Sequence, residues 1–548
     1  MFIQQMSPRV TAVCDALNTW LDDTCLTCLR ENNIQQLSRC LRIYATIDRV
    51  SAAERLVKDE IVRPQVEHCL SDSESVTSER LGQVCQSLLR IIPEHLAPLI
   101  RLTTDEKKII EGSVLGFDFL VNSFWNEVAE SFHQNLGHVA SPGNPDEFFK
   151  NYNIFIKFLD DLDMNIVTEN SLANIRNSEE YENLMKLWNL PVYFQLRFHQ
   201  IAKPVESLMI ATVLEKSENF HFKATEVSKS AIELCFSSDI YLHSISHRFL
   251  QLSFQIVARY KVWAELCLKT FMDSPSQEMK RSETSKNLRN LDTTSKKSLA
   301  KSSSERDLSS VSSAPSVLTV TMTDIISLFS DIEKFSTIIP QIIMVPSSNS
   351  VAISSSVKEA VTSLHSVVPK FSESIASNIA AEPMKLVKSV GDIPRMYRRT
   401  NRDTPSKPCP YIASVVSGFV EFYAGHKTTD RNTLTMWLMS ACDMVTDQFL
   451  VQVQDVLSNV TKMEESLRKL KKVRERGGAT GGEKDKSGGL SDDDKIRLQL
   501  YLDVSFFLRE LENGKLVDMK SVLNGESYKK IKLVVEEAVS SFIAEIKL

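Results

Sequence analysis

A run of evenly spaced apolar residues late in the chain constrains its fold more than any other feature. Seven of them recur alternately at four and three: Phe449, Val453, Val456, Val460, Met463, Leu467 and Leu470. That spacing is the 3.5-residue period of a coiled-coil seam, which a strand cannot present. The basic end "RKLKKVRER" suits the negative C-terminal end of the same helix. The sequence therefore predicts one long helix that needs a helical partner along its seam.

The partner of this seam has two candidate sources. One is a helix of the same chain, which Ser491 would cap and whose apolar face runs from Ile496 to Leu511. The other is a helix from another protein. A flexible linker of about twenty residues spans about 25 Å, which suffices for an antiparallel return. We therefore expect an intramolecular hairpin, and we take four seam residues as candidates for packing or interaction: Val456, Val460, Met463 and Leu467.

Glycine is scarce, and this scarcity extends the helical prediction to the whole chain. The sequence has 16 glycines in 548 residues, and six of them stand between positions 477 and 489. This fraction is far below the roughly 7% usual in proteins, so few turns and long regular elements are expected. No apolar run is long enough to span a bilayer, and a net charge of −6 gives no overall attraction to nucleic acid. The sequence predicts an all-α protein whose membrane contact is peripheral and which binds no nucleic acid.

Two segments of unusual composition divide the chain. Fourteen of the 43 residues from 274 to 316 are serine, and none is aromatic, so this stretch cannot bury enough apolar surface to order itself. The glycine-rich stretch from 474 to 490 is predicted to be a flexible linker. The predicted organisation is a helical segment, a helical bundle, a disordered linker, a bundle that ends in the heptad helix, a second linker and C-terminal helices: 1–139, 140–273, 274–318, 319–473, 474–490 and 491–548.

The stretch "WNLPVYFQLRFHQIAKPVE" (188–206) combines aromatic rings with an arginine. Asn189 followed by Pro191 indicates a helix start, and Pro204 predicts a kink or a break. Phe194 and Phe198 begin an apolar stripe at helical spacing that continues to Leu208, so we expect both rings to be buried. Arg197 falls off this stripe and is expected to be a nearby exposed or paired charge.

A basic cluster, "IPRMYRRTN" (393–401), allows two interpretations. Three arginines surround one tyrosine: Arg395, Arg398 and Arg399 around Tyr397. Such a cluster can hold phosphate or stack a base, or it can cap a helix and pair with acidic neighbours. We favour the second interpretation and keep the four residues as candidates for interaction.

Catalytic motifs are weak throughout. The carboxylates of "FLDDLD" (158–163) diverge around a helix, so a magnesium site at Asp160–Asp163 is the most distant alternative. Ten scattered cysteines lack a disulfide or zinc-ribbon spacing and suit a reducing compartment. We predict a non-catalytic scaffold with no cofactor and no metal. The main competing class is an unrelated α-helical adaptor or solenoid that binds peptides or helices.

Four stretches, taken together and in order, resemble the family of subunit 2 of the conserved oligomeric Golgi complex. They are "WNLPVYFQLRF" (188–198), "IPRMYRRTN" (393–401), "KMEESLRKLKK" (462–472) and "SDDDKIRLQLYLDV" (491–504). The resemblance covers most of the chain and is clearest from about residue 140 onward. The serine-rich and glycine-rich breaks fall where that family tolerates variable linkers.

The resemblance implies an elongated helical-bundle rod of the multisubunit tethering type. It implies a peripheral protein on the cytosolic face of the Golgi membrane, which captures vesicles in retrograde intra-Golgi transport, supports Golgi organisation and keeps glycosylation enzymes in place. The implied partners are subunits 1, 3 and 4 of the complex, together with SNAREs and golgin tethers. The family joins its partner subunits largely through an N-terminal coiled-coil region, and this sequence shows no long heptad segment before residue 140.

Overall fold

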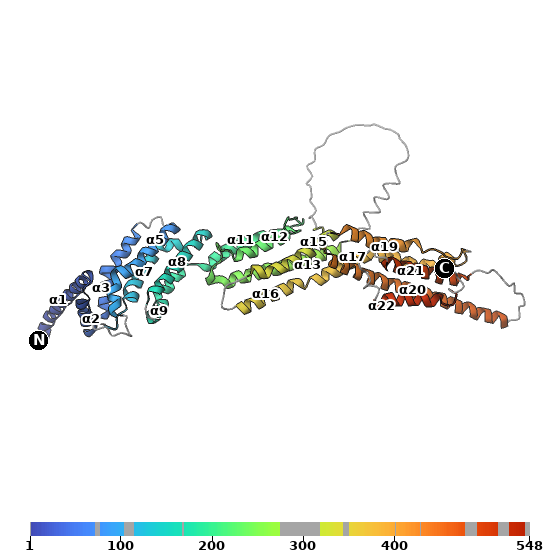
Figure 1. Ribbon diagram of the computed structural model, residues 1–548. Coiled ribbons are helices and arrows are strands. Elements are labelled where there is room, and N and C mark those ends of the chain that lie inside the picture. The colour runs from blue at the N-terminus through green and yellow to red at the C-terminus, as the bar shows by residue number, and fades with distance from the viewer. Residues whose placement is uncertain are drawn as a thin grey trace, which may run out of the picture. The chain divides into compact units, whose positions relative to one another are not determined.

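The computed structural model consists of helices and their connections (Figure 1). It describes residues 2–71, 77–103, 114–166, 169–274, 318–343, 350–400, 402–427, 429–476, 490–512 and 525–542. Within these ranges no strand forms, and the one extended pairing is an isolated bridge between Lys216 and Phe222. The prediction of an all-α fold is confirmed.

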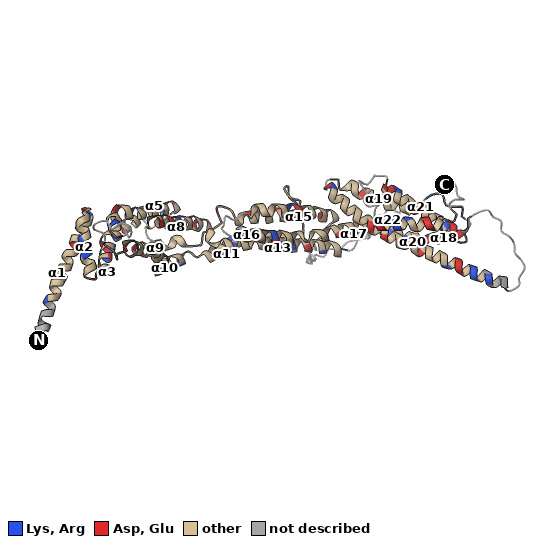
Figure 2. Cartoon of the chain, turned by 60° about the horizontal axis from the view of Figure 1, so that its bottom comes forward, with Lys and Arg blue, Asp and Glu red and all other residues tan. Residues whose placement is uncertain are grey.

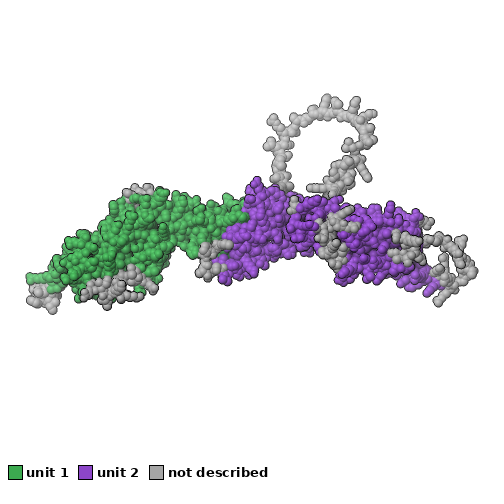
Figure 3. Space-filling view, in the orientation of Figure 1, with its two compact units in different colours: residues 1–207, 227–256 green, residues 208–226, 257–548 purple. Residues whose placement is uncertain are grey.

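The chain forms two compact units, coloured separately in Figure 3. Unit 1 comprises residues 1–207 and 227–256, and unit 2 comprises residues 208–226 and 257–548. The boundaries therefore fall inside α11, α12 and α13. The helices up to α13 are α1 (Phe2–Arg30), α2 (Ile34–Thr46), α3 (Val50–Val57), α4 (Arg63–Leu70), α5 (Ser78–Ile91), α6 (Ala97–Thr103), α7 (Asn126–Leu136), α8 (Pro145–Asn165), α9 (Glu169–Arg176), α10 (Glu179–Leu187), α11 (Leu190–Ile210), α12 (Lys223–Cys235) and α13 (Ser246–Asp273).

The helices after α13 all belong to unit 2. They are α15 (Met322–Ile342), α16 (Ser350–His365), α17 (Val368–Val387), α18 (Ile393–Tyr397), α19 (Pro410–Gly425), α20 (Arg431–Arg476), α21 (Asp492–Glu512) and α22 (Glu526–Val539). The shorter turns are π-helical at Lys58–Val62, Ile92–Leu96 and Leu120–Trp125, and 3-10 at Gly137–Ala140, His243–Ile245 and Lys388–Asp392.

Local chemistry sets several of the helix starts. Asn144 accepts hydrogen bonds from the N–H groups of Asp146 and Glu147 at 3.1 and 3.5 Å, and Pro145 opens α8. In the same way, Asn189 accepts from the N–H of Val192 at 3.2 Å at the start of α11. Ser491 accepts from the N–H of Asp494 at 3.1 Å and caps α21. The starts at Asn189 and Ser491 were predicted from the sequence, because a capping side chain reaches only the first turn of its own helix.

Proline at position 204 does not end its helix. α11 continues through Pro204 to Ile210, so the predicted break is absent. The ring removes one backbone donor, but packing holds the turn that follows: Val205 and Met209 are both buried. Tertiary contact overrides the local preference here.

Aromatic side chains form the core of unit 1 where α8 meets α10 and α11. Phe148 stacks on Tyr193 with ring centroids 5.1 Å apart, and Trp188 meets Phe148 edge to face at 5.5 Å. Tyr152 contacts the same tryptophan at 5.4 Å. This cluster joins helices whose residues lie about forty positions apart in the sequence, so it anchors the start of α11 against α8.

The two predicted linkers fall almost wholly outside the described residues, which exclude 275–317 and 477–489. The six-part division of the chain stays a prediction. All ten cysteines are free, and most are buried, where they pack as small apolar residues.

Candidate interaction surfaces

Arg197 of α11 is a buried cation that bonds to the buried Tyr193 and to two exposed partners, Asp146 and Gln200. Its side chain is 1% exposed and donates to three acceptors: the carboxylate of Asp146 at 2.7 Å, Gln200 at 2.9 Å and the Tyr193 hydroxyl at 3.2 Å. The Tyr193 hydroxyl in turn donates to the backbone oxygen of Ile240 at 2.7 Å. This chain of bonds ties α8, α11 and the loop before α13 together, so Arg197 is a structural cation.

Burial in α11 corrects the face predicted from the sequence. Phe194 and Phe198 are only half-buried, whereas Tyr193, Arg197 and Ile201 are buried. The buried face is thus turned by about one residue from the predicted apolar stripe. The reason is Asp146: an acidic partner at the start of α8 makes an arginine acceptable in the core. Whether the two partly exposed rings of Phe194 and Phe198 serve interaction stays a prediction.

The basic cluster at 393–401 packs against the acidic start of α21. Tyr397 is buried and donates to Gln499 at 2.7 Å. The Arg398 guanidinium lies 3.6 Å from the carboxylate of Asp493, and the backbone N–H of Arg399 donates to Asp492 at 3.2 Å. Arg399 adopts a positive φ of 60°, which turns the chain toward these carboxylates.

Arg395 and Arg399 are the members of this cluster whose side chains are exposed, and Arg395 is the one that pairs within its own turn. Its side chain is 85% exposed and pairs locally with Asp392 at 3.1 Å. Through Arg398 and Arg399, the stretch 393–401 contacts the stretch 491–504. Both are among the four stretches that carry the family resemblance. A role of Arg395, Tyr397, Arg398 and Arg399 in binding another molecule stays a prediction.

Asp503, further along α21, is a buried carboxylate that holds the chain before α19. It accepts from the backbone N–H of Cys409 at 2.6 Å, the Tyr411 hydroxyl at 2.8 Å and the Gln499 amide at 2.8 Å. Burial raises the pKa of Asp503, although these hydrogen bonds act in the opposite direction. The group is thus held in an environment that favours its protonated form more than water does.

The first half of the predicted seam on α20 is buried by other helices of the chain. Phe449, Val453, Val456 and Val460 are all 5% exposed or less. The ring of Phe449 meets that of Phe507 on α21 edge to face at 5.7 Å, and Glu464 pairs with Arg497 at 2.7 Å. Higher numbers on α20 thus meet lower numbers on α21, which is the antiparallel return that the spacing predicted.

The second half of the seam is exposed. Met463, Leu467 and Leu470 are 47%, 57% and 64% exposed. Burial of Met463 and Leu467, which the intramolecular hairpin implied, is therefore wrong. α21 begins at Asp492, only five residues before the Arg497 that pairs with Glu464, whereas α20 continues twelve residues beyond Glu464 to Arg476, so α21 is too short to cover the last turns of α20.

A second exposed stripe lies on α1. Val10, Val13, Leu17 and Trp20 recur at three, four and three, and each is at least 56% exposed. The C-terminal part of α1 packs on α2, and Leu21, Cys25 and Leu29 are buried there. Helical spacing alone places Val13, Leu17, Trp20 and Leu21 on one face. The structure buries Leu21 and leaves the other three in solvent, because α2 has only 13 residues and the buried positions of α1 begin at Leu21.

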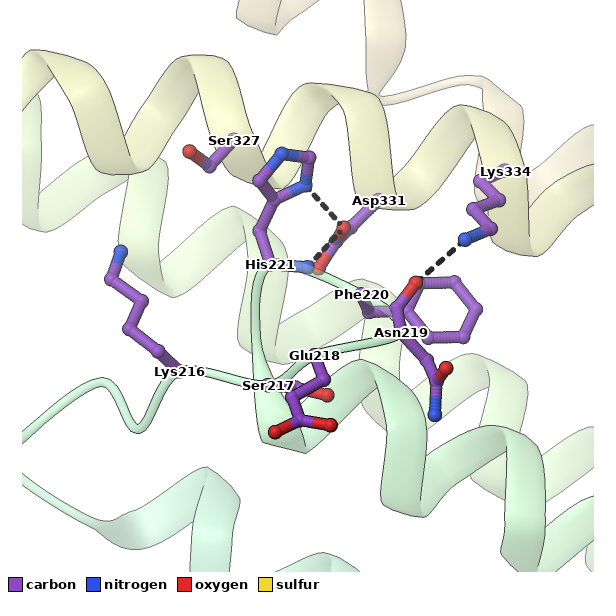
Figure 4. A pocket seen from close by; sticks show the side chains of 9 residues that line it. All are labelled: Lys216, Ser217, Glu218, Asn219, Phe220, His221, Ser327, Asp331 and Lys334. Atoms are coloured by element: carbon purple, nitrogen blue, oxygen red, sulfur yellow. Dashed lines mark hydrogen bonds and ion pairs between the residues drawn. The ribbon is translucent and has the colours of Figure 1, made fainter.

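A pocket in unit 2 lies between the 216–221 loop and α15 (Figure 4). Its floor contains Asp331, a buried carboxylate that accepts from the backbone N–H groups of His221 and Phe222, each at 2.9 Å. Two lysines on its rim are engaged: Lys334 donates to the backbone oxygen of Asn219, and Lys216 pairs with Asp324. The charges of this pocket therefore hold the loop on the helix.

The carboxylates of "FLDDLD" do not gather. Asp163 pairs with Arg176 of α9, and Asp160 and Asp161 are exposed. Across the described parts of the chain, no three His, Cys, Asp or Glu side chains are grouped so that they could hold a metal ion. Nor does any helix in those parts have the length and hydropathy needed to cross a bilayer.

The class of protein follows from these contacts: this is an all-α, helical-bundle protein in which most of the conspicuous polar side chains join one helix to another. A family model described as "COG complex component, COG2, C-terminal" matches residues 186–504. The chain therefore belongs to the family of subunit 2 of the conserved oligomeric Golgi complex. This membership sets aside the alternative of an unrelated helical adaptor.

Relatives from animals and a plant agree with the family model. Proteins named conserved oligomeric Golgi complex subunit 2 are 31% identical to this chain in Homo sapiens, 26% in Drosophila melanogaster and 25% in Arabidopsis thaliana. The alignments cover 93%, 88% and 93% of this chain, and 70%, 65% and 66% of those proteins. The chain thus spans about two thirds of the length of these relatives.

We predict that Arg197→Ala destabilises the protein more than Phe198→Ala. The substitution removes a buried side chain together with its bonds to Asp146 and to the buried Tyr193 hydroxyl, and should lower the free energy of unfolding by about 2–4 kcal/mol. Phe198 is half-exposed, so its truncation should cost only about 1–2 kcal/mol. Calorimetry of the full chain measures both, with the exposed Gln195→Ala as control. A larger loss for Phe198→Ala would contradict the assignment of Arg197 to the core.

We predict opposite outcomes for the same substitution in the two halves of the α20 seam. Val460→Asp places an unpaired charge among buried side chains and should lower the melting temperature by several degrees. Leu467→Asp, one heptad later, should leave it within about one degree because the side chain is already in water. Thermal unfolding followed by circular dichroism compares the two. Equal losses would mean that the last turns of α20 are covered in solution.

We predict that Asp503→Asn changes the pH dependence of stability. The folded-state pKa of Asp503 is raised, so the stability it contributes is fully present below the unfolded pKa and is lost as pH rises through the folded pKa. Asparagine does not titrate. The stability of the variant relative to the parent should therefore increase from about pH 4 upward and then level off. Melting temperatures of both proteins between pH 4 and 8 measure this, and parallel curves would refute it.

Proposed function

We propose that this protein is a non-catalytic subunit of a Golgi vesicle-tethering complex. In this role it acts in retrograde intra-Golgi transport, supports Golgi organisation and maintains glycosylation by keeping Golgi enzymes in their compartments. The observation that carries the proposal is the relationship to proteins named subunit 2 of the conserved oligomeric Golgi complex, which extends over about nine tenths of this chain in human, fly and plant.

The way the chain uses its polar residues supports a scaffold. Arg197, Asp331 and Asp503 are buried, and each bonds to segments far away in the sequence. Such groups are committed to holding helices and loops together, so they are not free to act on a substrate. A protein built in this way offers its partners rigid helical surfaces.

The partners in this proposal are subunits 1, 3 and 4 of the complex, with SNAREs and golgin tethers as further contacts. The α1 stripe supports assembly with another subunit. Its four exposed apolar side chains, Val10, Val13, Leu17 and Trp20, have the spacing of a helix-pairing seam. We place the pairing with a helix of another subunit on this face.

The proposed location is the cytosolic face of the Golgi membrane, held there peripherally through the rest of the complex. Tethers that work at this face capture vesicles by protein contacts. The exposed apolar side chains of α1 are arranged as a narrow stripe, which suits a helix partner better than the broad apolar face of a membrane-surface helix.

We predict that a double substitution on the α1 stripe breaks complex assembly without unfolding the protein. In cells that lack the endogenous protein, the unmodified chain should restore surface glycosylation, measured by lectin binding, and should co-purify with subunits 3 and 4. Leu17→Asp with Trp20→Asp should reduce that co-purification at least about ten-fold, because charges cannot be buried in a helix seam. Thr19→Asp, which adds the same charge on another side of α1, is the matched control.

The possible outcomes separate the parts of this proposal. If the unmodified chain fails to restore glycosylation while it is present at normal levels, the tethering role is wrong for this chain. If it restores glycosylation and the double variant does so equally well with all partners retained, the role stands and the assignment of assembly to α1 is wrong.

A further inference from the structure

We propose that α1 and α2 together form one docking surface for a single helix of another subunit, and that this partner helix carries a carboxylate beside Arg39. We call it the α1–α2 surface and define it by Leu17, Trp20, Ile43 and Ile47. The inference rests on the proposed function, in which the α1 stripe pairs with another subunit. It goes further because it adds α2 as a second contact and states the charge of the partner.

α1 and α2 run antiparallel and lie side by side (Figure 2). The Tyr44 hydroxyl donates to the carboxylate of Asp22, and the Cys28 thiol donates to the Gln36 side chain at 3.5 Å. These two contacts fix the register of the helix pair. They place the last turn of α2 about level with Trp20 of α1.

Two exposed isoleucines of α2 stand on the side of that helix that faces α1. Ile43 follows Gln36 by seven residues, and Ile47 follows Cys40 by seven, so each lies on the same line of the helix as the earlier residue. Gln36 contacts Cys28 of α1, and Cys40 is buried. Ile43 and Ile47 are nevertheless 44% and 45% exposed. They therefore lie where α1 and α2 leave an edge of their contact open.

The α1 stripe borders the same open edge. Asp22 and Tyr44 contact each other across the pair. Leu17 is turned by about 140° from Asp22 around α1, and Ile43 is turned by about 100° from Tyr44 around α2, both in the same sense. Because the two helices are antiparallel and face each other, the same sense of rotation leads to the same edge.

α2 continues the apolar line where α1 no longer supplies it. After Trp20, the next α1 positions at the spacing of the stripe are Thr24 and Thr27, whose hydroxyls donate to backbone oxygens one turn earlier. At this level the apolar side chains at the open edge are Ile43 and Ile47 of α2. A helix packed along the α1 stripe would therefore pass onto α2, as the third helix of a small bundle does.

Arg39 sets the charge expected of the partner. It precedes Ile43 by four residues, so the two lie on one ridge of α2, and its side chain is exposed. Among the residues that the structure describes, none forms an ion pair with Arg39. The carboxylates along this part of α1 lie more than about 100° around the helix from Leu17: Asp15, Asp22 and Asp23. A carboxylate on the partner helix would complement Arg39, as charged flanking positions do in coiled coils.

A second copy of the chain fits the α1–α2 surface less well. An interface between two identical copies uses the same patch on both, so the partner helix would come from the same surface. The ridge at Arg39 would then meet a patch that carries the same basic ridge and offers no carboxylate at its open edge.

Photo-crosslinking tests whether one partner helix touches both α1 and α2. A benzophenone amino acid replaces Leu17 or Ile43 in the full chain, in cells that lack the endogenous protein. Both positions should be linked to the same subunit of the complex, within about twelve residues of each other, because they are about two turns apart along the helix pair. Position 34 is the matched control: Ile34 is 43% exposed, lies on the opposite side of α2 from Ile43 and should give no such link.

Substitutions test the same surface through co-purification of the linked subunit. Ile43→Asp with Ile47→Asp should reduce it about ten-fold or more, whereas Ile34→Asp should leave it unchanged. Arg39→Glu should reduce it about three-fold or more, and Arg39→Lys should retain it. Melting temperatures of all variants within about two degrees of the parent show that the fold is retained.

The outcomes separate this inference from the proposed function. Loss of the subunit with Leu17→Asp and Trp20→Asp, but not with Ile43→Asp and Ile47→Asp, would overturn the inference and leave the pairing of α1 intact. No loss with either pair would overturn both. Links from positions 17 and 43 to different subunits, or a linked helix with no Asp or Glu near position 39, would also overturn the inference. Links to another copy of this chain would assign the surface to a second copy.

Discussion

The buried seam of α20 is the surface on which unit 2 is assembled. Near the start of α20, the ring of Trp437 meets that of Phe329 on α15 with centroids 5.0 Å apart. Further along, Phe449 meets Phe507 of α21. α17 and α22 pack along the same helix, and the side chains that face them, including Cys442 and Val445, are fully buried. Most of the stability of a helix in a protein comes from the packing of its apolar face, and this applies to the 46 residues of α20. The positions of α15, α17, α21 and α22 are therefore set by their packing against the buried apolar face of α20.

Buried carboxylates fix the loops that join these helices. Glu54 accepts from the backbone N–H of Asp118 at 2.8 Å, Asp331 accepts from His221 and Phe222, and Asp503 accepts from Cys409. In each case one side chain on a helix satisfies backbone donors of a segment more than sixty residues away. A loop without regular structure has free N–H groups that must find acceptors when they are covered. A buried carboxylate provides two oxygens for that purpose at the cost of its own desolvation, which explains why burial raises the pKa of Glu54 and Asp503.

The sequence predicts what is local and misses what is distant. The helix starts at Asn189 and Ser491 follow from residues within one turn. The all-α class follows from the scarcity of glycine, and the antiparallel return of α21 follows from the heptad seam and the length of the linker. The buried face of α11 does not, because Arg197 belongs to the core only through Asp146, 51 residues earlier. Apolar periodicity counts arginine as polar and so selects Phe194 and Phe198 one position away. The exposure of Trp20 also depends on a distant feature: the spacing within α1 does not state that the packing against α2 begins only at Leu21.

The limit of the buried seam on α20 depends on where α21 begins. Ser491 caps α21, and only five residues of α21 precede Arg497, which pairs with Glu464, so less than two turns of α21 extend beyond that pair. α20 continues to Arg476, which at 1.5 Å per residue extends about 18 Å past the pair. These turns need no nucleation of their own, because they propagate from a helix that is already packed. The last turns of α20 are thus helical because they extend a packed helix, whereas their apolar side chains, Met463, Leu467 and Leu470, are exposed.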